Sequence, residues 1–166
     1  IYQNVRRTMV RKVLVSTSPF GLHNHEPIQI LKNTGLEVSF NQFKRRLTES
    51  ELTDLIPQVE ILIAGTEPIT DTVLQAARSL RLIARVGIGL DNVDLDAARC
   101  RGINVSYTPD APTPAVAELT LGLILSLLRG IHEANLSLHN SKWMRFTGRR
   151  FSEITLGVIG AGRIGS

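Results

Sequence analysis

The chain has 166 residues, of which 43% are hydrophobic and 20% charged, and its mean hydropathy is +0.06. These values are typical of a folded globular protein and exclude a disordered, fibrous or membrane-embedded chain. The net charge of +4 raises the question of a nucleic-acid partner, but the basic residues fall in short separate runs without interleaved aromatic residues, which favours a solvated face. The single cysteine, Cys100, cannot form a disulfide within the chain and fits a reducing cytoplasm.

Short β-branched apolar segments alternate with segments of helical spacing. We interpret residues 1–9 as a leader, with Met9 as a candidate native start. Strands are expected at Lys12–Ser16, Glu37–Phe40, Glu60–Ala64, Leu82–Val86 and Ile103–Ser106, and helices at Pro27–Thr34, Thr48–Ile56, Thr70–Ser79 and from Asp94 to Gly102. The strands are apolar almost throughout, as in parallel strands covered on both faces. This order predicts an α/β fold.

A proline-rich loop, Thr108–Pro114, precedes a long apolar helix. Thr113 is expected to cap this helix and Pro114 to occupy its first position, and the pattern continues as one helix to Asn140. The helix is apolar all round from Leu119 to Leu128, which is too short for a membrane span. It should therefore be buried on several sides. It is either a core helix of a monomer or a helix that links two domains and packs against a second subunit.

A first glycine cluster, Gly87–Asn92, directly follows the expected strand Leu82–Val86. Consecutive backbone N–H groups at the carboxyl end of a strand can face an anion in a crevice. The alternative is a tight strand-to-helix turn that needs glycine only for its positive φ.

A second cluster lies in Thr155–Gly165, where an apolar strand is expected to run into the pattern G-x-G-x-x-G. In a dinucleotide-binding βα unit, Gly160 would make the tight turn, Gly162 would let the backbone approach a pyrophosphate, and Gly165 would let helix and strand pack closely. The acidic residue expected about 20 positions later for the ribose hydroxyls would lie beyond Ser166.

From Leu82 to Gly165 the chain resembles the D-isomer-specific 2-hydroxyacid dehydrogenases, and among them the D-3-phosphoglycerate dehydrogenase-like branch. The resemblance rests on LIARVGIGLDNVDLDAARCRGI, on TPDAPTPAVAELTLGLILSLLR, on Lys142-Trp143 and on TLGVIGAGRIG, in the order that the family shows. It implies a flavodoxin-like, parallel-sheet substrate domain over residues 10–112. Residues 113–166 would be the long helix that crosses between domains and forms the dimer, followed by the first strand of a truncated Rossmann domain.

The family's binding residues carry over at the motif positions. The amides of Ile88 and Gly89 match the positions that hold the substrate carboxylate, and Ile88 also lines the nicotinamide side. Arg85 matches a basic residue near the substrate phosphate, although it could equally pair with Asp91.

The cofactor positions carry over in the same way. Arg163 and Ile164 match the pair whose amides meet the cofactor pyrophosphate, beside Gly160, Gly162 and Gly165.

The chain departs from the family at two places. Phosphoglycerate enzymes often show an arginine after the third strand, where this chain reads Ala64-Gly65-Thr66-Glu67-Pro68, and this puts a phosphorylated substrate in doubt. Pro112 stands where the family is often polar, which could alter contacts near the nicotinamide.

The resemblance implies an oxidoreductase that transfers hydride between a nicotinamide cofactor and a D-2-hydroxy or 2-keto acid. We expect NAD as the cofactor, with NADP open, a homodimer in the cytoplasm, and neither nucleic acid nor membrane as a partner. No metal is expected, because His23 and His25 lack a third ligand nearby. The catalytic Arg, Glu and His are expected beyond Ser166, so the chain alone should be inactive. The alternative is a non-catalytic, dimerising, nucleotide-binding regulatory module.

Overall fold

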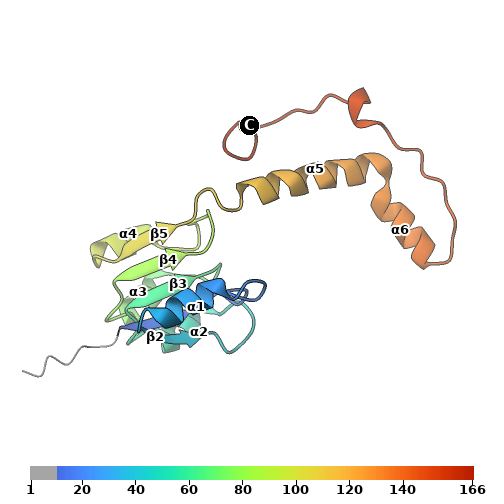
Figure 1. The fold of residues 1–166 in the computed structure, drawn as a ribbon. Coiled ribbons are helices and arrows are strands. Elements are labelled where there is room, and N and C mark those ends of the chain that lie inside the picture. The colour runs from blue at the N-terminus through green and yellow to red at the C-terminus, as the bar shows by residue number, and fades with distance from the viewer. Residues whose placement is uncertain (1–10) are drawn as a thin grey trace, which may run out of the picture. The chain divides into compact units, whose positions relative to one another are not determined.

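The computed structural model describes residues 11–166, so the expected leader, residues 1–9, lies outside the described residues. The chain divides into two compact units, one that ends at Thr108 and one that runs from Pro109 to Ser166 (Figure 1).

The first unit is built on a five-stranded parallel sheet. Its strands are β1 (Lys12–Val15), β2 (Glu37–Phe40), β3 (Ile61–Ala64), β4 (Leu82–Arg85) and β5 (Asn104–Tyr107), in the order β2-β1-β3-β4-β5 (Figure 1). In this register Leu62 lies between Leu14 and Ile83, and Ile83 also pairs with Val105. The order is that of flavodoxin-like folds, so the expected α/β fold is confirmed.

Four helices connect these strands: α1 (Glu26–Asn33), α2 (Glu49–Leu55), α3 (Asp71–Ala76) and α4 (Leu95–Cys100). Two of them begin at side-chain caps that satisfy otherwise unpaired N–H groups. Thr48 accepts from the N–H of Glu51 while the Glu51 carboxylate accepts from the N–H of Thr48, and Asp94 accepts from the N–H of Ala97 at 2.9 Å. These caps fix where α2 and α4 start.

The two faces of the sheet bury different amounts of apolar surface. On one face Leu14, Leu62 and Ile83 pack with the apolar side chains of α2, α3 and α4. On the other face a smaller cluster forms around Val13, Val15 and Ile63, against which Phe20 and residues near α1 pack. Successive residues of a strand point to opposite faces, and a run of apolar residues therefore serves both clusters.

The second unit contains α5 (Thr113–Arg129), α6 (Ile131–His139) and a short 3₁₀ helix, Phe151–Glu153. The prediction of one helix to Asn140 is wrong. Gly130 has φ 60° and ψ 36°, the left-handed conformation that ends helices, and the two helices meet at an angle of 66°. The prediction that Thr113 caps the helix is also wrong, because Pro112 is the N-cap residue and Thr113 Oγ1 has no hydrogen-bond partner in the described chain.

The apolar side chains of α5 are exposed or only partly covered. No residue of α5 is buried within the part of the chain that the structure describes, and the exposed fraction reaches 82% at Leu127. The expected burial on several sides is therefore not met within residues 11–166. No helix of these residues is by itself long and apolar enough to cross a membrane, whereas α5 and α6 together would reach that length and composition as a bent pair.

Residues 155–160 were expected to form a strand, and the structure shows no regular element there. A strand needs a neighbouring strand for its main-chain hydrogen bonds, and within residues 11–166 no segment pairs with this one.

Candidate functional site

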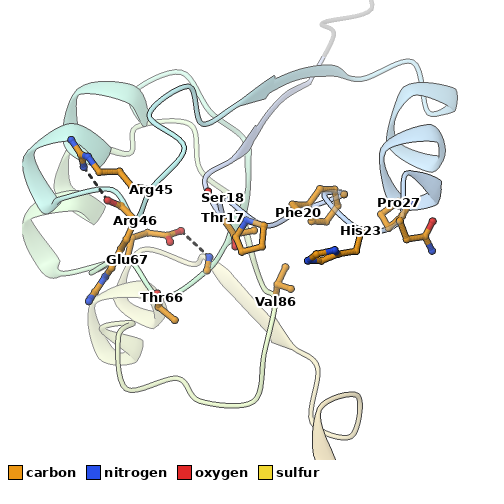
Figure 2. A pocket seen from close by; sticks show the side chains of 14 residues that line it. Thr17, Ser18, Phe20, His23, Pro27, Arg45, Arg46, Thr66, Glu67 and Val86 are labelled. Atoms are coloured by element: carbon orange, nitrogen blue, oxygen red, sulfur yellow. Dashed lines mark hydrogen bonds between the residues drawn. The ribbon is translucent and has the colours of Figure 1, made fainter. Parts of the chain in front are cut away.

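A cavity of about 670 Å³ opens at the carboxyl ends of β1 and β3 (Figure 2). Its walls include Thr17–Gly21 after β1, Gly65–Glu67 after β3, and Val86 after β4. The strand order reverses between β1 and β3, and open α/β sheets bind ligands in the crevice at such a reversal. The cavity is therefore the candidate ligand site of the first unit.

Gly87 forms the turn that follows β4. Its φ is 143°, and it is tied to the end of β5, because its N–H donates to Thr108 Oγ1 at 2.9 Å and its oxygen accepts from the Thr108 N–H at 3.0 Å. A Cβ at Gly87 would lie 2.9 Å from Cζ of Arg85, too close for two carbon atoms. Gly87 thus serves the tight turn, as one of the two interpretations of this cluster expected.

Within the described chain, the two residues after Gly87 have unpaired backbone N–H groups. Among the hydrogen bonds of residues 11–166, none is donated by the amide of Ile88 or of Gly89. Gly89 does not have a positive φ, and a Cβ there would lie 2.7 Å from Asp91 Oδ1. Two adjacent uncommitted N–H groups at the carboxyl end of a strand are the arrangement that binds a carboxylate or another small anion.

Arg85 ends β4 beside this turn. Its Nε lies 3.4 Å from Asn92 Oδ1 and its Nη1 donates to the oxygen of Val86. No ion pair in the described chain joins Arg85 to Asp91, which is exposed. The guanidinium charge of Arg85 therefore has no carboxylate partner within these residues.

A polar network that the sequence did not predict joins the turn after β4 to the loop after β3. Asn92 Nδ2 donates to the main-chain oxygens of Gly65 at 3.2 Å and of Glu67 at 2.7 Å. The Glu67 side chain, 1% exposed, accepts from the N–H of Gly65 at 2.8 Å and from the hydroxyl of buried Ser16. The available signal was the acidic Glu67, three positions after the apolar strand that ends at Ala64. We interpreted this segment only as a departure from the family.

Arg45, a cation that lines the same cavity as Glu67, is committed elsewhere. Arg45 Nη2 lies 2.6 Å from Glu51 Oε1, and the Arg45 side chain also lies over the ring of Phe43. The hydrogen bonds from Arg45, followed by that from the N–H of Thr48, lower the pKa of Glu51 from 4.5 to about 2. The same pairing raises the pKa of Arg45.

The glycine-rich segment of the second unit forms a tight turn. Gly160 has φ 92°, and a Cβ on Gly165 would overlap the oxygen of Gly160 and lie 3.3 Å from Val158 Cγ1. The Ser166 N–H donates to the oxygen of Gly162 at 3.0 Å, as in a first helical turn. Only Gly165 leaves no room for a side chain, since a Cβ on Gly160 or Gly162 would meet nothing within 4 Å. A glycine-rich turn ahead of a helical turn is the arrangement that accepts a dinucleotide pyrophosphate.

Two further predicted cofactor residues lie in this segment. The Arg163 side chain forms an ion pair with Asp110, in which Nε lies 2.7 Å from Oδ1. The charge of Arg163 is therefore paired within the second unit. Ile164 lines a groove of about 490 Å³ between α5 and residues 156–166. No group of three potential metal ligands occurs in residues 11–166.

The first unit is flavodoxin-like and carries a pair of free N–H groups. A glycine-rich segment typical of nucleotide-binding folds follows it. Together these features define the class, an α/β protein with a nucleotide-binding segment. The family model for the D-isomer specific 2-hydroxyacid dehydrogenase catalytic domain matches residues 13–160, and the chain belongs to this family.

Two sequence relatives and one solved structure show what the chain is similar to. The chain is 38% identical over 164 residues to the D-3-phosphoglycerate dehydrogenase of Synechocystis sp. and 38% identical over 155 residues to the hydroxypyruvate reductase of Thermotoga maritima. These matches cover 97% and 88% of this chain but 28% and 49% of the relatives. The D-lactate dehydrogenase of Aquifex aeolicus, solved with NAD and lactic acid, shares the fold with a TM-score of 0.75 at 23% identity, over 93% of this chain and 46% of that one.

Proposed function

We propose that this chain supplies the acid-binding part and the start of the cofactor-binding part of an NAD-dependent D-2-hydroxyacid dehydrogenase. The observation that carries the proposal is the pair of uncommitted amides at Ile88 and Gly89, at the carboxyl end of β4. The names of the similar proteins, which include a hydroxypyruvate reductase and D-3-phosphoglycerate dehydrogenases, support a small hydroxy or keto acid as the substrate.

In this proposal the amides of Ile88 and Gly89 bind the substrate carboxylate, and Arg85 adds a positive charge beside them. Residues 10–112 form the substrate domain, and residues 113–166 form the crossing helix and the start of the Rossmann domain. The whole protein works in the cytoplasm.

The glycine-rich segment holds the cofactor in this proposal. The backbone N–H groups of Arg163 and Ile164 would meet the pyrophosphate, and Gly162 would allow it to approach closely. Gly160 would make the tight turn and Gly165 would let helix and strand pack closely. Bound NAD supplies the hydride acceptor at its nicotinamide ring. The proposal takes NAD as the cofactor and leaves NADP open, since structures of similar fold were solved with NAD and with NADPH.

We further propose that two copies associate through α5. The exposed fractions of Leu119, Leu123 and Leu127 are 62%, 57% and 82%, and the helix is apolar all round from Leu119 to Leu128. A surface of this kind on a helix favours association, because burying each such side chain contributes about 1.5–3 kcal/mol before the entropy cost.

The acid–base residue of the reaction is proposed to lie outside this chain. His23 lines the cavity of the first unit, but no hydrogen bond of residues 11–166 orients its ring. A general base needs such an orienting partner to hold its tautomer and position.

The proposal is tested by NMR titration of the ¹⁵N-labelled 166-residue chain with D-lactate and with D-lactamide, which lacks the negative charge. D-lactate is expected to shift the amide signals of Ile88 and Gly89, because a carboxylate accepts from both. D-lactamide is expected to leave them in place. Equal shifts with both compounds, or none with either, would contradict the proposal.

A further inference from the structure

The side chain of Asn92 connects the end of β4 with the loop after β3. Its Nδ2 donates to the main-chain oxygens of Gly65 at 3.2 Å and of Glu67 at 2.7 Å. Its Oδ1 accepts from Nε of Arg85 at 3.4 Å. Carbonyl oxygens accept and a guanidinium donates, so only one orientation of the amide satisfies all three partners. An aspartate would have no hydrogen to donate to the two oxygens, and these contacts therefore require an uncharged amide at position 92.

The guanidinium of Arg85 is fixed through two of its nitrogens. Nε contacts Asn92 Oδ1, and Nη1 donates to the main-chain oxygen of Val86. Within residues 11–166 no hydrogen bond or ion pair involves Nη2. Both acceptors are neutral, so they hold the guanidinium in place without neutralising its charge. A free nitrogen on a fixed cation is suited to pair with a carboxylate.

The same guanidinium lies against Gly87, where the turn after β4 begins. A Cβ on Gly87 would lie 2.9 Å from Cζ and 3.1 Å from Nη2 of Arg85, so the guanidinium occupies the space that a side chain would take. Ordinary bond lengths then place Nη2 no more than about 7 Å from the amide nitrogen of Ile88. Two donors at that separation can hold the two oxygens of one carboxylate, because each such hydrogen bond spans about 2.8 Å.

The loop that supports Asn92 from the other side is itself held by buried contacts. The Glu67 side chain, 1% exposed, accepts from the N–H of Gly65 at 2.8 Å and from the hydroxyl of buried Ser16. Gly65 and Glu67 also supply the two oxygens that Asn92 contacts. Asn92 therefore ties Arg85 to a buried, hydrogen-bonded part of the first unit.

We propose that Asn92 is a positioning residue, which holds the Arg85 guanidinium against the turn through a neutral contact and so keeps Nη2 charged and available to an acid. The inference rests on the proposed function, because the acid in question is the one bound by the amides of Ile88 and Gly89. It adds a residue that acts on the acid only through Arg85.

The test is a double-mutant cycle on the 166-residue chain, in which NMR titration of Ile88 and Gly89 gives the affinity for D-lactate. Asn92→Ala is expected to weaken D-lactate binding about tenfold, which corresponds to one hydrogen bond between a charged and a neutral group. Arg85→Met removes the charge and keeps a long side chain. In the Arg85→Met chain, Asn92→Ala is expected to change the affinity by less than about twofold, because no guanidinium remains to be positioned.

Substitution by aspartate separates position from charge. Asn92→Asp can still accept from Arg85 Nε, but its carboxylate neutralises the guanidinium, so D-lactate should bind more weakly than it does to Asn92→Ala. The control Asn104→Ala removes an exposed amide at the start of β5 and is expected to leave the affinity unchanged.

The Nε–Hε signal of Arg85, which is identified by its loss in Arg85→Met, reports the contact directly. In the unchanged chain this proton is expected to exchange with water more slowly than that of Arg81, an exposed arginine. Asn92→Ala is expected to remove the protection. The measurement on the unchanged chain needs no folded variant of Asn92.

The outcomes distinguish this proposal from the proposed function. If D-lactate shifts Ile88 and Gly89 but Asn92→Ala weakens binding equally in both backgrounds, or in neither, the positioning role is wrong and the proposed function stands. An unprotected Nε–Hε proton in the unchanged chain, or D-lactate binding by Asn92→Asp as tight as by the unchanged chain, also overturns the positioning role. If D-lactate shifts neither amide, both proposals fall.

Discussion

The side-chain amide of Asn92 donates a hydrogen bond of 2.7 Å to the main-chain oxygen of Glu67, 25 residues earlier in the chain. The same amide reaches the oxygen of Gly65 at 3.2 Å. One side chain therefore holds the loop after β3 and the turn after β4 at a fixed separation. A main-chain hydrogen bond of 2.8 Å from the Ile69 N–H to the oxygen of Asn92 joins the same two segments.

Replacing Asn92 with alanine is expected to lower the free energy of unfolding by about 1–3 kcal/mol, because two partly buried main-chain oxygens lose their donor. The same change should weaken the response of Ile88 and Gly89 to D-lactate. Urea unfolding and the NMR titration measure these effects. Gln29→Ala removes an exposed amide from α1 as the control, and a loss as large as that of Asn92→Ala would refute the special role of Asn92.

Glu51→Gln is expected to reduce the dependence of stability on pH in the acid range. The lowered pKa means that ionised Glu51 stabilises the folded state above pH 4.5, and that this contribution is lost as the pH falls from 4.5 to about 2. Glutamine can still cap the N–H of Thr48 but cannot pair with Arg45. Thermal unfolding between pH 2 and 7 should show a shallower slope than the unchanged chain.

The neighbouring change Asp54→Asn is the control for Glu51→Gln, because Asp54 also lies on α2 and forms no ion pair in the described chain. Identical pH profiles for the unchanged chain and Glu51→Gln would show that the Arg45 pair makes no contribution.

Gly130→Ala is expected to destabilise the bend between α5 and α6. The left-handed conformation at φ 60° costs a residue with a Cβ roughly 1–2 kcal/mol, and the added atom would lie 3.3 Å from Cβ of Phe146. Circular dichroism during thermal unfolding measures the change, with Gly122→Ala as the control inside α5, where a Cβ meets nothing within 4 Å. A more stable Gly130→Ala chain would show that the bend is not maintained in solution.

Sedimentation of the 166-residue chain is expected to show a dimer at micromolar concentration. Leu125 on α5 is 43% exposed, and Leu125→Asp should give a folded monomer because a charge cannot be buried in an apolar contact without a partner. Leu125→Met keeps the volume and should remain a dimer. If the unchanged chain is already a monomer, the proposed interface is wrong.

The 166-residue chain is expected to show no measurable turnover of D-2-hydroxy acids with NAD or of 2-keto acids with NADH. Loss of a positioned acid–base group alone removes about 10²–10⁴-fold in rate, and loss of the nicotinamide's orientation removes more. The absorbance of NADH measures turnover, and a chain extended by any coding sequence that follows Ser166 is the comparison. Comparable rates would place the acid–base residue within residues 1–166, while inactivity of both would favour the regulatory module.

Local patterns were enough to predict the strands of the first unit and the start of α4, because apolar runs and the cap at Asp94 act over a few residues. The break at Gly130 was missed because the helical spacing continues on both sides, and one glycine inside a helix costs only about 1 kcal/mol. The network of Asn92, Glu67 and Ser16 joins residues that are 25 and 51 apart, and no short pattern encodes such contacts.

Thr108 is the last residue of the first unit, and both its amide and its hydroxyl are bonded to Gly87. The residue that closes the first unit is therefore also the one that anchors the turn ahead of Ile88 and Gly89, so a change at Thr108 reaches the candidate anion site without altering any residue of that site.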